Sequence, residues 1–347
     1  MSFALTRQKS FFQFPRFNAG LLFSVLLALS FVMSLSLGAF SIPVFDIVSG
    51  TLNEQQHAVF TSIRLPRALL AGIVGAGLAI SGAALQGLFR NPLADPQLIG
   101  VSSGAALAVA ITIVFLGTAQ LSGFIALFTL SAAAFVGGLA TCLIIFKIAS
   151  ISGRVSVAHM LLAGIAISAI AFSGIGFLSY IGDDQQLRAI TFWTMGSLGG
   201  ALWPAVILAA FIVLPCCLFL FRQSQSLNIL QLGEEESHYA GIDPEKTKNY
   251  TVVAVALCIG ACVAVSGVIG FVGLVVPHLI RLSIGPNHRI LLPLSALLGA
   301  SLLIIADTAA RTIVAPAEMP VGILTALIGG PYFLWLLTRQ YKKGFSL

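Results

Sequence analysis

The chain has 347 residues, of which 58% are hydrophobic and only 9% are charged. Soluble globular domains carry about 25% charged residues, so a water-soluble enzyme is excluded. The net charge of +6 is what a membrane protein acquires from basic residues kept at one face, and we expect no nucleic-acid partner.

The N-terminus is basic, with Arg7, Lys9 and Arg16, and resembles a signal peptide. The apolar run that follows, over residues 17–40, is longer than the roughly 7–15 residues of a signal-peptide core. We therefore expect a cytoplasmic tail over residues 1–16 and then a first membrane-spanning helix.

Further apolar segments approach the roughly 20 residues that a spanning helix needs, and no soluble domain fits between them. The predicted spans are 17–40, 68–89, 98–116, 121–148, 157–181, 204–221, 250–266, 269–283, 290–306 and 321–337. The predicted fold class is an all-α polytopic membrane protein of about ten transmembrane helices. One transmembrane domain covers residues 17–340, and residues 341–347 form a cytoplasmic tail.

The basic residues give these spans an orientation. With both termini in the cytoplasm, only Arg64, Arg67, Arg188 and Arg311 of the 18 lysines and arginines lie outside. Because loops on the cytoplasmic side retain basic residues, this bias favours cytoplasmic termini.

Small residues recur at a spacing of four, as in Gly72/Ala76 and Gly100/Gly104, which is typical of closely packed membrane helices. The five cysteines lie in apolar runs, so we interpret them as packing residues rather than disulfide partners or zinc ligands. Cys258 and Cys262 share a helix face, but no His or carboxylate neighbours them in the sequence. No metal site is predicted.

Catalytic motifs are missing from the sequence. It has no GxxxxGK[ST] phosphate loop, no HExxH helix and no Ser or Cys nucleophile beside a spaced His and Asp, so no catalytic residue is predicted. The predicted spans also lack the central acids and bases of ion-coupled carriers. Asp307 and Arg311, one helical turn apart, are interpreted as an ion pair at a helix end.

Two polar segments flank the second span. Arg64-Leu-Pro-Arg67 opens it on the outer side, where the two arginines are expected to project positive charge outward. Together with Arg311 they favour docking of an acidic partner over lipid-phosphate anchoring. On the inner side, Arg90-Asn-Pro-Leu-Ala-Asp-Pro96 leads to the third span, with Asp95 as a helix cap and Pro96 in the first helical position. This turn fits either a tight helix connection or a gate.

Residues 223–249 form the long polar connection of the chain, on the cytoplasmic side. Three glutamates starting at Glu234 suit a helix N-terminus, Gly241 can end that helix, and Asp243-Pro244 can begin another short helix. A solvated loop and a lever pushed by a cytoplasmic motor both remain open. Further on, the glycine-rich run over residues 266–278 contains Pro277, which can kink a helix.

Together these motifs resemble the permease subunit of type II ABC importers, the iron-siderophore, haem and cobalamin permease family. The similarity runs in order from the first span to the tenth. It is carried by Arg64-Leu-Pro-Arg67, Ser81-Gly82 with Gln86, residues 90–96, 233–235 and 270–278, Asp307 with Arg311, and Glu318-Met-Pro-Val-Gly322.

The resemblance implies a homodimer with about twenty spans in the bacterial inner membrane, which works by alternating access along its two-fold axis. It also implies a cytoplasmic ABC ATPase dimer that holds ATP and Mg²⁺, and a periplasmic substrate-binding protein. This chain itself would bind no cofactor.

The same resemblance assigns roles by position. It implies that Arg64, Arg67 and Arg311 receive carboxylates of the binding protein. The cytoplasmic gate would be Arg90, Asn91, Pro92 and Leu93. The helix that couples to the ATPase would be Gly233, Glu234, Glu235, Glu236, Ser237, His238, Tyr239, Ala240 and Gly241. Ser237 and Ala240 stand where many relatives carry Ala and Leu.

Residues 178–198 look most like the haem-importing branch, which implies a short helix entering the pathway between spans five and six. Candidate pathway-lining residues are Arg188, Phe192, Trp193 and Met195. Aromatic and thioether groups near an arginine suit haem, although an apolar lining suits a ferric siderophore as well. The alternatives are an ion-coupled secondary carrier or channel that acts without an ATPase, and a membrane scaffold without transport.

Overall fold

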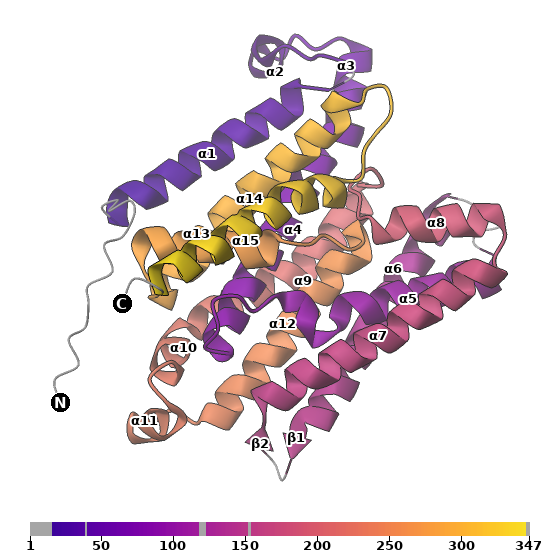
Figure 1. Cartoon of the computed structure of the whole chain (residues 1–347). Coiled ribbons are helices and arrows are strands. Elements are labelled where there is room, and N and C mark those ends of the chain that lie inside the picture. Colours follow the sequence, from indigo (N-terminus) through magenta and orange to yellow (C-terminus); the bar gives the residue numbers. More distant parts are fainter. Residues whose placement is uncertain (1–15, 39, 118–122, 152–153, 345–347) are drawn as a thin grey trace.

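The protein is described from a computed structural model, which covers residues 16–38, 40–117, 123–151 and 154–344 (Figure 1). Long helices make up most of this structure. They are α1 (Arg16–Ser36), α4 (Leu65–Leu88), α5 (Val101–Leu116), α6 (Gly123–Ala149), α7 (Val157–Ile181), α9 (Trp203–Arg222), α12 (Pro244–Ser266), α13 (Val272–Ile284), α14 (His288–Ile313) and α15 (Val321–Gly344).

Shorter elements connect the long helices at the two ends of the bundle (Figure 1). At one end, called here the α3 end, lie α2 (Val44–Ser49), α3 (Glu54–Val59), the π-helical segment η1 (Phe60–Arg64) and α8 (Asp184–Thr194). At the opposite, α11 end lie α10 (Ser224–Leu230), α11 (Glu234–Tyr239) and the two-residue strands β1 (Ser150–Ile151) and β2 (Arg154–Val155). The 3₁₀ turn η2 (Pro96–Ile99) follows α4, and the two strands pair antiparallel.

Each of the ten apolar segments expected from the sequence contains a helix in the part that the structure describes. Within the described residues, seven helices have the length and composition to cross a membrane, and α5, α13 and the apolar part of α15 are shorter. An all-helical membrane fold is therefore confirmed, whereas the number of spans stays a prediction.

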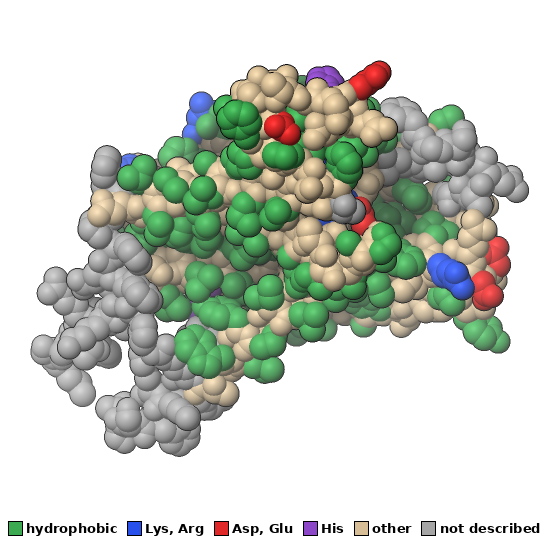
Figure 2. Space-filling view, turned by 90° about the horizontal axis from the view of Figure 1, so that it is seen from above, with side chains coloured by type: hydrophobic (Ala, Val, Ile, Leu, Met, Phe, Trp, Pro, Cys, Tyr) green, Lys and Arg blue, Asp and Glu red, His purple; other side chains and the backbone are tan. Residues whose placement is uncertain are grey.

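The bundle has central helices and peripheral ones. About 78% of the apolar window in the helical run ending with α4 is buried, and 72% in α12, but only 22% in α7 and in α9. Peripheral helices leave large apolar side chains such as Ile170 and Phe211 exposed. Seen from above, the surface shows many hydrophobic side chains and few charged ones (Figure 2). The exposed apolar side chains of α7 and α9 suit contact with lipid rather than water.

Glycines bring the central backbones together. A Cβ atom at Gly75 of α4 would lie 2.8 Å from the carbonyl carbon of Gly299 in α14. One at Gly104 of α5 would lie 2.7 Å from the carbonyl oxygen of Gly137 in α6. Because lipid gives helices no hydrophobic reason to associate, close approach of this kind supplies the packing energy.

One local expectation needs correction, and two short helices were not expected. The separate short helix expected to begin at Asp243-Pro244 does not form; instead Asp243 caps α12, which starts at Pro244 and runs without a break through residue 266. The end of the polar connection over residues 223–249 therefore belongs to a long helix. The short helices α2 and α3 between the first two long helices were not anticipated.

Candidate functional site

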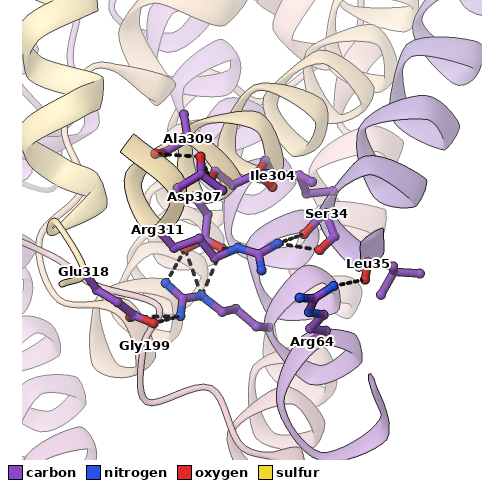
Figure 3. Close-up of polar contacts among 12 residues, drawn as sticks. Ser34, Leu35, Arg64, Gly199, Ile304, Asp307, Ala309, Arg311 and Glu318 are labelled. Atoms are coloured by element: carbon purple, nitrogen blue, oxygen red, sulfur yellow. Dashed lines mark hydrogen bonds and ion pairs between the residues drawn. The ribbon is translucent and has the colours of Figure 1, made fainter. Parts of the chain in front are cut away.

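Two arginines cap the end of α1 at the α3 end of the bundle (Figure 3). Arg64 Nη1 donates to the carbonyl oxygens of Leu35 at 2.6 Å and Ser36 at 2.7 Å. Arg311 Nη2 donates to the hydroxyl of Ser34 at 3.1 Å and to its carbonyl oxygen. The last carbonyls of a helix have no partner within the helix and carry the negative end of its dipole, so both guanidinium groups stabilise this terminus.

Arg67 forms the centre of an ion-pair network beside them. Its Nε and Nη2 donate to the carboxylate of Asp307 at 3.0–3.1 Å, and its Nη1 donates to both oxygens of Glu318 at 2.9 and 3.0 Å. The predicted pair between Asp307 and Arg311 is confirmed at 3.7 Å. Sequence reasoning missed the shorter pair from Arg67 to Asp307, because 240 positions separate the two residues.

The arginines do not project outward as the sequence analysis expected. Arg64, Arg67 and Arg311 are only 4%, 6% and 9% exposed, because they bond to the end of α1 and to Asp307. Glu318 is the exposed member of the network, with 51% of its side chain accessible. Whether the three arginines dock a partner stays a prediction.

The predicted gate turn follows α4 at the α11 end. Arg90 has a φ of 51°, in the left-handed region. Its N–H donates to the Gly87 carbonyl oxygen at 3.2 Å, and the Asn91 N–H donates to that of Gln86 at 3.2 Å. These two bonds define a Schellman motif, which usually has glycine where Arg90 stands. A non-glycine residue in this conformation costs about 1–2 kcal/mol, so the turn is strained at Arg90.

Asp95 ends this turn as the predicted helix cap. Its Oδ1 accepts the Gln97 N–H at 2.9 Å, and burial raises the pKa of the Asp95 carboxyl, against the lowering effect of that hydrogen bond. The cap begins the 3₁₀ turn η2, and α5 starts only after Gly100. Pro92 and Leu93 complete the turn, in which the Asn91 side chain accepts the Leu93 N–H at 3.0 Å.

The glycine-rich run packs against the same part of α4. Gln86 Nε2 donates to the Leu274 carbonyl oxygen at 3.1 Å. A Cβ atom at Gly82 would lie 2.8 Å from Gly273 Cα, and one at Gly273 would lie 2.8 Å from Pro96. Residues that the sequence analysis singled out separately therefore meet at the start of α13.

A polar joint that the sequence analysis did not find connects α10 to α14. The backbone N–H of His288 donates to Asn228 Oδ1 at 2.8 Å, and its ring nitrogen Nδ1 lies 2.9 Å from the same oxygen. Asn228 Nδ2 also donates to Asn287 Oδ1 at 2.9 Å. The ring of His288 packs on α4, where a Cβ atom at Gly87 would lie 2.9 Å from its Cε1. The only indication of this polar joint in the sequence is the polar pair Asn287-His288 between two apolar runs.

Helix α11 is the predicted coupling helix, and its two glycines have specific roles. Gly233 has a φ of 153°, and a Cβ atom there would collide with the Glu236 carboxylate. Gly241, with a φ of 79°, ends the helix as expected, since the N–H of Ile242 returns to the Ser237 carbonyl oxygen at 2.9 Å.

One lysine attaches α11 to the bundle. Lys248 Nζ lies 2.9 Å from Glu234 Oε1 and 2.8 Å from Glu245 Oε1, and its side chain is only 5% exposed. Glu245 also accepts the Val155 N–H at 2.9 Å. The remaining coupling-helix residues Glu235, Glu236, His238, Tyr239 and Ala240 are exposed.

Helix α8 begins with a capping box between Asp183 and Gln186. Gln186 Nε2 also donates to the Val114 carbonyl oxygen at 3.3 Å, which holds α8 against the end of α5. A short helix between α7 and α9 is what the resemblance to the haem-importing branch implied.

The candidate lining residues lie on and just after α8. Arg188, Phe192 and Met195 are exposed, whereas Trp193 is half-buried against the core. Their place in a pathway stays a prediction.

The cysteines take part in packing. Cys258 and Cys262 donate from Sγ to the carbonyl oxygens of Gly77 at 3.6 Å and Val74 at 3.8 Å in α4. Among the described residues, no group of three or more His, Cys, Asp or Glu side chains could hold a metal ion.

Comparison with known proteins identifies the chain. The model of the FecCD transport family matches residues 26–339. The chain belongs to this family. It is 51% identical to the hemin transport system permease protein HmuU of Yersinia pestis, over 95% of this chain and 97% of that protein. It is 42% identical to the cobalamin import system permease protein BtuC of Halobacterium salinarum, over 82% of this chain and 74% of that protein.

A solved structure supports the same assignment. An inward-facing metal-chelate type ABC transporter matches with a TM-score of 0.82 and 35% identity, over 93% of this chain and 99% of that chain. The permease is thus a multi-pass membrane protein with the type II importer fold. It belongs to a family of permease subunits and is not itself an ATPase.

Proposed function

We propose that this permease carries haem, or failing that a ferric siderophore, from the periplasm to the cytoplasm, using ATP hydrolysed by a partner. The observation that carries the proposal is the 51% identity to a hemin permease over nearly the whole of both chains, against 42% to a cobalamin permease. Haem is flat and apolar with two propionates. The exposed Phe192, Met195 and Arg188 offer aromatic, thioether and guanidinium groups that match this chemistry.

The working unit is a homodimer of ten-span subunits, with the path along its two-fold axis and alternating access between the two sides. In this arrangement the transmembrane domain covers residues 17–340, both termini are cytoplasmic, the α11 end faces the cytoplasm and the α3 end the periplasm. The distribution of basic residues supports this orientation, since only four of the 18 lie on the proposed outer side.

Residues 233–241 seat on the cytoplasmic ABC ATPase, which holds ATP and Mg²⁺. Two large side chains at this helix support the role: Tyr239 is 89% exposed and Leu232 is 72% exposed. Large apolar groups exposed on an otherwise polar surface are typical of a protein interface. The strained turn over residues 90–93 serves as the cytoplasmic gate. Arg64, Arg67 and Arg311 receive carboxylates of a periplasmic substrate-binding protein.

Purification of the tagged permease from native membranes tests this function. We expect an ATP-binding subunit at one copy per permease and a binding protein with a haem absorption band. In proteoliposomes, haem uptake should stop without Mg-ATP. Uptake by the permease alone that responds to an ionophore would instead identify a secondary carrier, and no accumulation under either condition would identify a scaffold.

A further inference from the structure

The two carboxylates on Arg67 lie in different surroundings. Asp307 is 1% exposed and belongs to α14, whereas Glu318 is 51% exposed and belongs to the segment between α14 and α15. Removing Arg67 from Asp307 would leave a buried carboxylate without that partner, which is strongly unfavourable. Glu318 can instead turn into water, where an exposed ion pair contributes little. Of the two pairs, Arg67–Glu318 is therefore the one that can exchange.

Glu318 also lies against the segment that follows α8. A Cβ atom at Gly199 would be 3.0 Å from Glu318 Oε2, and the close-up places Gly199 beside the Glu318 carboxylate (Figure 3). Just beyond this contact, the Gly322 N–H donates to the Gly196 carbonyl oxygen at 3.4 Å. Residues 196–200, which directly follow the candidate lining residues, thus meet the segment that carries Glu318.

The charges around Arg67 favour the binding of a carboxylate from another protein. Among the described residues, Arg67 and Arg311 pair with two carboxylates, Asp307 and Glu318. The neighbouring Arg64 bonds to backbone carbonyls instead and adds a third positive charge. When Glu318 turns away, Asp307 is the carboxylate that stays paired with Arg67 and Arg311. A carboxylate arriving from outside then finds a partly buried guanidinium with free donors, where a bidentate pair is strong.

We propose that Glu318 is an exchangeable internal ligand of Arg67, which holds the place that an acidic side chain of the docking protein takes on binding. Its departure frees the segment over residues 314–320 from its contact at Gly199. This inference rests on the docking role proposed above for Arg64, Arg67 and Arg311. Glu318 thereby links docking at the α3 end to the segment after α8.

The test compares Glu318→Gln with Glu54→Gln in the intact complex. Gln keeps the shape of Glu318 but not its charge, and Glu54 is an exposed glutamate of α3 at the same end. The probe is the binding protein that co-purifies with the wild type. We expect Glu318→Gln to bind it about five-fold more tightly at low ionic strength, with a smaller difference at high salt. Glu54→Gln should bind like the wild type.

Hydrogen exchange provides a second readout. Without binding protein, amides of residues 196–200 and 314–320 should exchange faster in Glu318→Gln than in the wild type. Adding the binding protein to the wild type should have the same effect. Equal or weaker docking by Glu318→Gln, with unchanged exchange, would show that Glu318 is a fixed structural partner and overturn the inference alone. A wild-type complex that retains no binding protein would overturn the proposed docking function as well.

Discussion

Replacing Lys248 by Met tests how firmly the proposed coupling helix is held. The lysine is buried at the junction of α11, α12 and β2, where it pairs with Glu234 and Glu245 at 2.9 and 2.8 Å. Its Nζ also lies 3.4 Å from the Val155 carbonyl oxygen. Met keeps the apolar stem but makes none of these bonds, so α11 loses its ionic attachment to α12.

The loss of stability in Lys248→Met depends on whether Glu234 and Glu245 find other partners. Glu234 is 52% exposed and can hydrate, and Glu245, 26% exposed, keeps its bond from the Val155 N–H. Neither is left buried without a partner, so the cost stays below the roughly 3–5 kcal/mol of a broken buried pair. Hydrogen bonds to charged groups contribute about 1.5–3 kcal/mol each, and the ammonium no longer has to be desolvated. We expect a net loss of about 2 kcal/mol.

Lys246→Met is the matched control, two positions away in the same helix. Lys246 is 70% exposed and forms an exposed ion pair with Asp243 at 3.5 Å, so its loss should be hardly measurable. The assays are thermal unfolding of the purified complex and the ratio of ATP hydrolysed to haem transported in proteoliposomes. Lys248→Met should unfold a few degrees lower and hydrolyse more ATP per haem. Identical behaviour of the two variants would refute the attachment role of Lys248.

Three other substitutions probe the gate turn, the α4 packing and the coupling helix. Asp95→Asn keeps the oxygen that caps η2 but removes the charge that burial disfavours. Because burial raises the pKa of the Asp95 carboxyl, the folded wild type binds a proton more readily than the unfolded chain and should gain stability on acidification, whereas Asp95→Asn should not. Melting curves of the two proteins between pH 4 and 7 measure this difference. Gly82→Ala should destabilise the permease by about 1–3 kcal/mol through collision with Gly273, whereas Gly176→Ala, with open space around it, should leave the melting temperature unchanged. Glu235→Arg should uncouple ATP hydrolysis from transport in a folded dimer, and unchanged uptake would contradict the coupling role of α11.

Local signals in the sequence were sufficient for most helices and caps. A long apolar run constrains its own backbone, because an unpaired peptide group in lipid is costly. For this reason each of the ten expected segments contains a helix in its described part. The caps at Asp95, Asp243 and Gly241 are equally local, since each bond spans only a few residues. The error at Asp243 concerned the length of the helix that followed its cap.

The polar contacts at the α3 end could not be predicted from local sequence patterns. Arg64 bonds to carbonyls 28 and 29 positions earlier, and Arg67 bonds to carboxylates 240 and 251 positions later. No pattern within a segment indicates such partners. The arginines were recognised by their position outside a membrane span, but their burial depends on where α1 and α14 end.

The α11 end combines rigid attachment with one strained turn. Lys248 holds α11 to α12, and Asn228 holds α10 to His288, whose ring packs on Gly87 in the last turn of α4. The next turn of chain contains the left-handed Arg90. In the proposed mechanism, a displacement of α10 and α11 by the ATPase therefore reaches the gate turn through side chains in contact. Because Arg90 is held in an unfavourable conformation, we expect a shift of the α4 terminus to favour a different turn geometry.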